Sequence, residues 1–147
     1  MAAEIVHVTS EEQLRLGLDI RKKVFVEEQK VPADLEIDEY DVIGDNAHHI
    51  VIMDEGLPVA TGRLIYYKAG TAKMQRIAVL KEYRSKGYGR VLLLAMEELA
   101  RDLGLEFSVL DSQCQAEEFY SRLGYEVISP EPFYDAGILH VRMQKAL

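Results

Sequence analysis

The chain has 147 residues, 48% of them hydrophobic, which suits one compact domain over residues 1–147 with its own core. Its formal net charge of −8 repels nucleic-acid phosphates, so we expect no nucleic-acid partner. The longest wholly apolar run, Val91–Met96, is far shorter than the ~20 residues of a membrane span, and the single cysteine excludes an internal disulfide. The first residues also lack the layout of a signal peptide. We therefore expect a cytoplasmic protein with no membrane partner.

The N-terminal third is predicted to form a strand, a helix and a loop. The strand covers Glu4–Val8. A helix follows from Thr9–Ser10, because glutamate and glutamine stand three residues after these two capping residues. Its expected inner face carries Leu14, Leu18, Arg21, Phe25 and Glu28. Pro32 ends this region, and the acid-rich stretch Ala33–Asp45 is predicted to be a loop.

The rest of the chain alternates strands with helices. We predict strands over His48–Met53, Val59–Tyr67, Met74–Leu80, Phe107–Leu110, Tyr125–Ile128 and Gly137–Met143. Helices are predicted over Gly87–Leu103 and Ala116–Leu123, with glycines closing both. This order predicts an α/β (or α+β) fold with one mixed sheet that contains parallel and antiparallel pairs.

The loop between the strand Met74–Leu80 and the long helix predicts an anion site. It consists of Arg84, Ser85, Lys86, Gly87, Tyr88, Gly89 and Arg90. Backbone amides at a helix start are unpaired, glycines allow a ligand close to the main chain, and the basic side chains add charge. The spacing of neither a nucleotide-triphosphate loop nor a dinucleotide loop is present. A different diphosphate ligand is therefore expected.

The pattern R/Q-x-x-G-x-G/A of this loop resembles that of the GNAT-type N-acetyltransferases. Before the loop, Arg76–Val79 is similar to the family strand that pairs with the pantetheine arm of coenzyme A. After it, the family pattern N/Q-x-x-A-x-x-x-Y-x-x-x-G-F/Y is matched by Gln113, Ala116, Tyr120, Gly124 and Tyr125. The segment Arg21–Gln29 and the strand Gly137–Met143 resemble a bacterial subgroup, the ElaA-like or YjcF-like acetyltransferases.

The resemblance implies a single GNAT-like domain that transfers an acetyl group from acetyl-coenzyme A directly to an amine of a small molecule or peptide. In this interpretation the loop amides from Arg84 to Arg90 hold the pyrophosphate. The main chain at Ile77, Ala78 and Val79 holds the pantetheine arm, and Gln113 belongs to the same site. Tyr120 is expected to protonate the departing thiolate.

The base that deprotonates the amine is less closely defined by the sequence. His140 lies in the subgroup's last strand and is the first candidate, whereas His48 and His49 point to opposite faces of a strand. An acyl-enzyme route through Cys114 is an alternative to direct transfer. No spacing of histidine, cysteine or carboxylate residues indicates a metal site.

Acidic residues crowd between Glu27 and Asp41, with Lys30 as the only positive charge among them. Glu28, Glu36 and Asp38 therefore suggest a carboxylate-lined entrance that attracts a cationic amine acceptor. Two other classes remain open. They are a non-catalytic module that binds or senses acyl-coenzyme A, and a structural domain that binds a partner. The sequence is also compatible with a homodimer.

Overall fold

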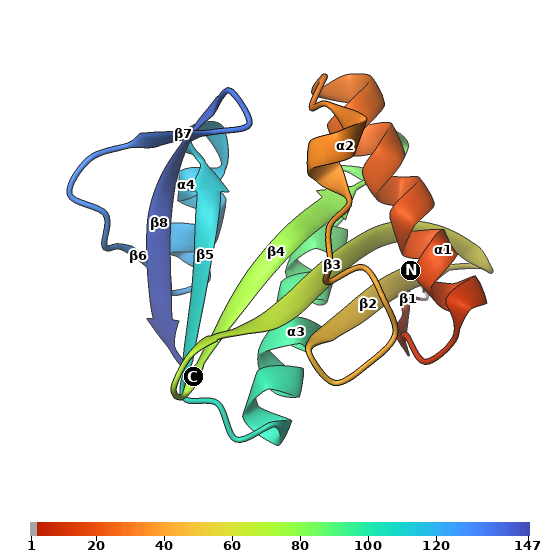
Figure 1. Cartoon of the computed structure of the whole chain (residues 1–147), viewed down its shortest axis with the longest axis horizontal. Helices are drawn as coiled ribbons and strands as arrows, with labels where there is room; N and C mark the ends of the chain where they lie inside the picture. The colour runs from red at the N-terminus through yellow and green to blue at the C-terminus, as the bar shows by residue number, and fades with distance from the viewer. Residues whose placement is uncertain (1–2) are drawn as a thin grey trace.

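The computed structural model describes residues 3–147, which form one eight-stranded sheet (Figure 1). The strands are β1 (Ala3–His7), β2 (Ala47–Asp54), β3 (Leu57–Lys68), β4 (Thr71–Val79), β5 (Phe107–Gln113), β6 (Glu126–Val127), β7 (Phe133–Asp135) and β8 (Ile138–Ala146). Their order is β1-β2-β3-β4-β5-β8-β6, and β7 pairs with β8. Among these described pairs only β4–β5 is parallel, which confirms the predicted mixed sheet.

Helices cover both faces of the sheet. They are α1 (Glu11–Arg21), the π-helical segment η1 (Lys22–Glu28), α2 (Ala33–Glu36), α3 (Tyr88–Asp102) and α4 (Glu117–Arg122). Two 3-10 turns, η2 (Lys81–Tyr83) and η3 (Cys114–Ala116), precede α3 and α4. Figure 1 shows α1 and α2 in front of the strands from β2 to β4, with α3 behind them and α4 behind β5.

The first helix begins as predicted, and its buried face overlaps with the expected one at Leu14 and Arg21. The Ser10 hydroxyl accepts the Gln13 amide at 3.2 Å, and the Thr9 amide donates to the Gln13 side chain at 2.7 Å. The fully buried positions are Leu14, Gly17, Ile20 and Arg21. A Cβ at Gly17 would lie 2.8 Å from the Thr61 hydroxyl, so the glycine lets α1 approach β3 closely. Leu18, which was expected on this face, is only half-buried.

Three short elements differ from the sequence prediction. The acid-rich stretch expected to be a loop contains α2, and the strand expected over Tyr125–Ile128 is only the two-residue β6. The strand β7 was not expected; it pairs with β8 across a turn in which Ala136 and Gly137 have positive φ angles. Elements of two to four residues carry too little periodicity to be predicted from sequence.

The sheet opens between β4 and β5. These strands pair only from Thr71 to Met74 and from Phe107 to Leu110, and Figure 1 shows them diverging beyond that point. In the diverging part β4 bulges, because Arg76 has a φ of 55° and the register with β3 shifts there. Gly62 of β3 lies opposite the bulge, where a Cβ would be 2.6 Å from the Met96 sulfur of α3. Helix α3 therefore packs directly on the backbone behind the bulge.

Six charged side chains in front of the bulge form what we call the ion cluster: Arg21, Arg63, Arg76, Glu36, Asp38 and Asp41. Arg21 lies 2.6 Å from the Glu36 carboxylate, and Arg63 lies 2.7 Å from Asp38 and 2.9 Å from Asp41. Burial alone would raise the pKa of Asp41, but hydrogen bonds from Arg21 and the Asp38 amide hold it well below its usual range. The cluster fixes the acidic segment against β3 and β4.

Replacing Asp41 by asparagine should lower the free energy of unfolding by about 3–5 kcal/mol, because two buried arginines lose a shared counter-charge. Denaturant unfolding measures the change. Asp45→Asn, in the exposed part of the same loop, is the matched control and should leave stability unchanged. A depressed carboxyl pKa stabilises the fold above the unfolded pKa of about 3.9, so this contribution should disappear as pH falls below that value. Equal stability of both variants would contradict the structural role of the cluster.

Candidate functional site

A cavity of about 390 Å³ lies where β4 and β5 diverge. Its walls come from β4, β5, the η3–α4 segment, the start of β8, and the segment from Phe25 to Glu36. Five of the predicted site residues, Glu36, Ile77, Gln113, Tyr120 and His140, line this one cavity although they are far apart in the sequence. The structure therefore brings the predicted strand, acid and base candidates together.

The Tyr120 side chain enters the cavity from α4. Its ring packs edge-on against Phe119 at 5.0 Å and Tyr125 at 6.1 Å between centroids. Within residues 3–147 its hydroxyl has no hydrogen-bond partner and is not sealed from solvent. Burial raises the pKa of Tyr120 to about 12, so the phenol is protonated at any physiological pH. The hydroxyl is therefore a proton donor available to a molecule in the cavity.

His140 lies on β8, opposite Gln113 of β5. Its Nδ1 is 2.7 Å from the Ile138 carbonyl, and its ring stacks on Phe133. Because a carbonyl can only accept, Nδ1 carries the proton of the neutral ring. This tautomer leaves Nε2 with a free electron pair, which is the state that a general base requires.

Beyond Met74, the edge of β4 that would pair with β5 has no neighbouring strand. Ile77, Ala78 and Val79 belong to this free edge, and Ile77 lines the cavity. The Val79 carbonyl is already occupied, since the Arg84 Nε donates to it at 3.0 Å. The remaining main-chain groups of the edge can pair with an extended ligand as a strand would.

The glycine loop presents a set of unpaired amides at the start of α3. Ser85 and Gly87 both have left-handed backbone conformations, with φ of 64° and 88°. None of the amides from Ser85 to Arg90 donates to a backbone carbonyl within the described residues. Such an arrangement at a helix N-terminus favours an anion. The Tyr88 side chain plays a different part, because its hydroxyl donates to Asp54 at 2.6 Å inside the protein.

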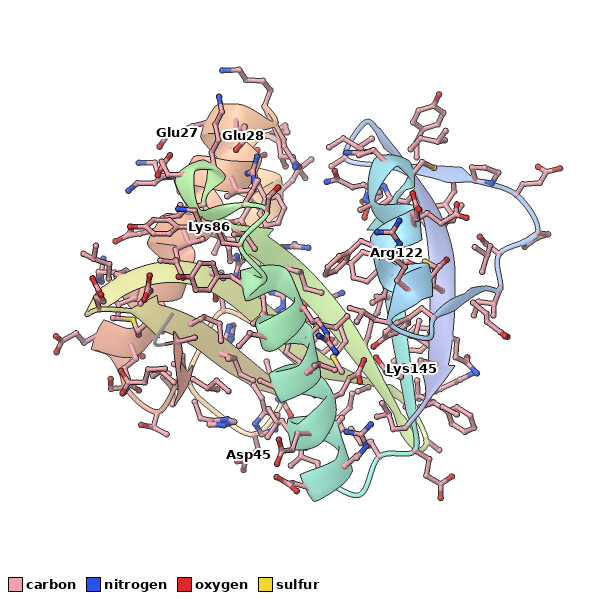
Figure 2. The ribbon with its side chains drawn as sticks, turned by 180° about the vertical axis from the view of Figure 1, so that it is seen from behind. Glu27, Glu28, Asp45, Lys86, Arg122 and Lys145 are labelled. Atoms are coloured by element: carbon pink, nitrogen blue, oxygen red, sulfur yellow. The ribbon has the colours of Figure 1, made fainter. Side chains whose placement is uncertain are left out.

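The basic side chains of the loop are not all directed at an anion. Arg84 donates two hydrogen bonds to the Glu28 carboxylate, at 2.6 and 2.7 Å. It therefore connects the loop to η1 instead of standing free, which differs from the sequence prediction. Lys86 lies 5.5 Å from the Tyr83 ring centre and is exposed. Figure 2 shows Lys86 below Glu27 and Glu28, and Arg122 of α4 across the opening.

The acidic residues predicted to form a substrate entrance are paired with arginines. Glu28 bonds Arg84, Asp38 bonds Arg63, and Glu36 lies 2.6 Å from Arg21 with 3% of its side chain exposed. The crowding of negative charge is therefore opposed, because the counter-charges come from other parts of the chain. A role for Glu28, Glu36 and Asp38 in binding the acceptor stays a prediction, without the reason that suggested it.

The other candidate bases and the cysteine lie outside the cavity lining. His48 lies 3.3 Å from the Tyr66 hydroxyl, and His49 lies 2.9 Å from the Tyr40 carbonyl. Cys114 is half-buried at the end of β5. Between residues 3 and 147, no helix has the length and apolar character to cross a membrane, and no three potential metal ligands lie close enough together to bind an ion.

The sequence interpretation missed polar residues on the cavity side of the sheet. Lys73 and Gln75 of β4 and Asp111 of β5 line the cavity beside Gln113, which the sequence had already indicated. The signal was present, because polar residues two apart in each strand share one face. A further contact, between the Gln113 and Gln29 side chains at 2.9 Å, joins β5 to the residue after η1.

Comparisons with known proteins agree with this geometry. A family model described as an acetyltransferase (GNAT) domain matches residues 7–147. The uncharacterized N-acetyltransferase YjcF of Bacillus subtilis is 44% identical over 136 residues, covering 92% of this chain and 94% of YjcF. Among solved structures, an acyl-CoA N-acyltransferase from Pseudomonas aeruginosa has a TM-score of 0.84 and 27% identity, covering 99% of this chain and 100% of that protein. Escherichia coli ElaA has a TM-score of 0.84 and 25% identity, covering 98% of each chain.

These matches extend over nearly the whole chain, and the similarity holds both in sequence and in fold. They confirm the resemblance to the YjcF-like and ElaA-like acetyltransferases that the segment Arg21–Gln29 and the strand Gly137–Met143 indicated. The chain belongs to the GNAT acetyltransferase family and is an acyltransferase enzyme.

Proposed function

We propose that this enzyme transfers an acetyl group from acetyl-coenzyme A directly to an amine of a small molecule or peptide, with Tyr120 as the general acid. The observation that carries the proposal is the opening between β4 and β5. It places a free strand edge, a phenol without a hydrogen-bond partner among residues 3–147 and a histidine whose Nδ1 faces a carbonyl around one cavity. The name of the Pseudomonas aeruginosa relative supports an acyl-coenzyme A as the donor.

The residues present fit coenzyme A. The amides from Ser85 to Arg90 suit a pyrophosphate, and the free edge at Ile77 suits the amides of a pantetheine arm. Gly89 supports the fit, because a Cβ there would lie 3.3 Å from Phe119 of α4 and 3.8 Å from Val79 of β4, so a larger side chain would fill the space between these elements and the loop. Acetyl-coenzyme A supplies, when bound, a thioester whose acyl group is activated for attack by an amine.

Tyr120 acts as a donor to the leaving sulfur. Its pKa of about 12 is well above the ~8.5 of a thiol in water, so the buried phenol is a weaker acid than a free thiol. The burial that raises the phenol pKa also raises that of a thiol held in the same cavity. Tyr120 therefore stabilises the developing thiolate by a hydrogen bond and gives up its proton as the sulfur leaves.

His140 is the group we assign to remove the proton of the amine. Its Nε2 has a free electron pair, and Phe133 and the Ile138 carbonyl hold the ring in place. An amine of pKa ~10.4 is almost fully protonated at neutral pH, so a base near the cavity increases the reactive fraction. A water molecule between His140 and the amine would serve the same purpose.

Replacing Gly89 by valine should abolish coenzyme A binding while leaving the protein folded, because the branched side chain fills the space beside the loop amides that a phosphate would need. Isothermal titration calorimetry with coenzyme A measures the loss. Gly44→Val is the matched control, since a Cβ at Gly44 has no atom within 4 Å and its φ is ordinary. Undiminished affinity in the Gly89 variant would rule out this loop as the coenzyme A site. Gly87 is less suited to the test, because its φ of 88° strains any side chain.

Arg84→Ala should weaken coenzyme A binding by about 1–2 kcal/mol, because the loop loses its connection to η1. The same reason predicts that Glu28→Gln weakens binding as well. If the Arg84 charge contacted a phosphate instead, Glu28→Gln would release the guanidinium and tighten binding. Calorimetry separates the two outcomes, with Glu27→Gln, on the neighbouring exposed carboxylate, as the control.

Tyr120→Phe should reduce turnover by roughly 10²-fold or more at unchanged stability, because the hydroxyl has no partner inside the described protein to lose. Thiol release from acetyl-coenzyme A across a panel of amines measures turnover. The raised pKa of Tyr120 also predicts the pH dependence of the wild type. Activity should increase with rising pH as the amine loses its proton, and it should not fall near pH 10, because the phenol is still protonated there. Coenzyme A binding without thiol release from any amine, in wild type and variant alike, would favour the non-catalytic sensing module.

A further inference from the structure

Lys73 places a positive charge on the floor of the cavity. It lies on β4 one residue before the pairing with β5 ends, and its side chain is only 16% exposed. Its ammonium nitrogen is 3.4 Å from an Asp111 oxygen and 5.2 Å from the Tyr67 ring centre. The Asp111 contact is longer than the usual 2.7–2.9 Å of a charge-assisted hydrogen bond, and the Tyr67 contact is a cation–π contact that uses none of the ammonium's hydrogen-bond donors. An ammonium group has three donors, so Lys73 retains capacity for a further acceptor.

The carboxylate beside Lys73 is already committed to another cation. Arg142 of β8 donates from Nε to one Asp111 oxygen at 2.8 Å and from Nη2 to the other at 3.1 Å. The third Arg142 contact, to the Tyr67 hydroxyl at 2.8 Å, holds the guanidinium in this position. Burial alone would raise the pKa of Asp111, but the hydrogen bond from Arg142 and the charge of Lys73 lower it. Two cations thus share one carboxylate, which leaves one positive charge in excess.

The other charged groups on the cavity wall do not cancel this excess. Glu36 is bonded to Arg21, and Arg76 lies 3.4 Å from Asp38 and 3.7 Å from Glu36 within the neutral ion cluster. Asp135, the last residue of β7, is exposed, so water screens its charge. Lys73 is therefore the cavity-lining cation that lacks a committed counter-charge among residues 3–147.

We infer that the acceptor carries an anionic group, a carboxylate or a phosphate, on the same small molecule as its amine, and that Lys73 binds this group. The inference rests on the proposed function and specifies the substrate class of the same site. An anion bound at Lys73 balances the excess positive charge on the floor of the cavity. The amine of the same molecule then faces Tyr120 and His140, which line the same cavity. It replaces the cationic acceptor that the crowding of acidic residues suggested.

The test compares amines that differ only in the anionic group. Amino acids are paired with their carboxamides, ω-amino acids with the corresponding alkylamines, and phosphoethanolamine with ethanolamine. Thiol release at saturating acetyl-coenzyme A gives kcat/KM for each. The anionic member of the productive pair should exceed its neutral partner by roughly 10-fold or more, as one charge-assisted hydrogen bond predicts. The amino-acid and phosphoethanolamine arms show whether a carboxylate or a phosphate is recognised.

Lys73→Met keeps most of the side chain's length and leaves the Asp111–Arg142 pair intact. It should remove the preference by raising KM for the anionic acceptor about 10-fold, with the KM for acetyl-coenzyme A unchanged. Lys68→Met, on an exposed lysine at the end of β3, is the matched control and should retain the preference. Equal kcat/KM for both members of every productive pair, or an equal loss for both in Lys73→Met, would overturn the inference.

A binding measurement separates this inference from the proposed function. The thermal shift of the coenzyme A-saturated protein is recorded with the anionic amines and with their N-acetylated forms. A stabilisation that Lys73→Met abolishes and Lys68→Met retains supports the anion site, even where no amine is acetylated and the proposed function fails. Acetylation of amines without any shift from an anionic compound retains the proposed function and overturns the inference.

Discussion

The arginines and carboxylates of the ion cluster hold one wall of the cavity against the sheet. Arg21 comes from α1, Arg63 from β3 and Arg76 from the bulge of β4, while their partners all lie between α2 and the loop after it. Taking such charges out of water costs free energy, so the cluster contributes less to net stability than its number of bonds suggests. The cluster fixes the position of the acidic segment. Without the ion pairs this segment would be a mobile loop, whereas with them it forms a wall of the cavity. Arg76 connects that wall to β4, whose edge faces the cavity.

The opening of the sheet depends on what happens on both sides of that bulge. In front, the ion cluster holds Arg76 in a left-handed conformation that breaks the regular register with β3. Behind, the contact of Met96 with Gly62 leaves no room for a side chain. A strand bent in this way cannot stay parallel to β5, so pairing ends at Met74. One distortion therefore provides both the cavity and the free backbone edge that the proposed donor requires.

Local patterns in the sequence were sufficient for the glycine loop, the capped first helix and the position of Tyr120. Each depends on residues within a few positions of one another, where helix and turn rules apply directly. The partners of the charged residues could not be predicted in this way. Arg84 meets Glu28 from 56 residues away, and the Asp111–Arg142 pair joins two strands that lie side by side only in the folded sheet. Which charged residues pair depends on how the strands and helices are arranged in the fold, whereas the sequence shows only which residues are neighbours along the chain.

This distinction changes how the net charge of −8 bears on recognition. Summed over the chain, the charge predicts a cationic ligand, yet fields from exposed carboxylates are screened within about 8–10 Å at moderate ionic strength. Inside the cavity the carboxylates of Glu36 and Asp111 are neutralised at contact distance, and Lys73 is the group left without a full counter-charge. A half-buried charge is screened far less than exposed ones, so it decides affinity once a ligand has arrived. The negative surface then slows the approach of an anionic acceptor, while the cavity selects it.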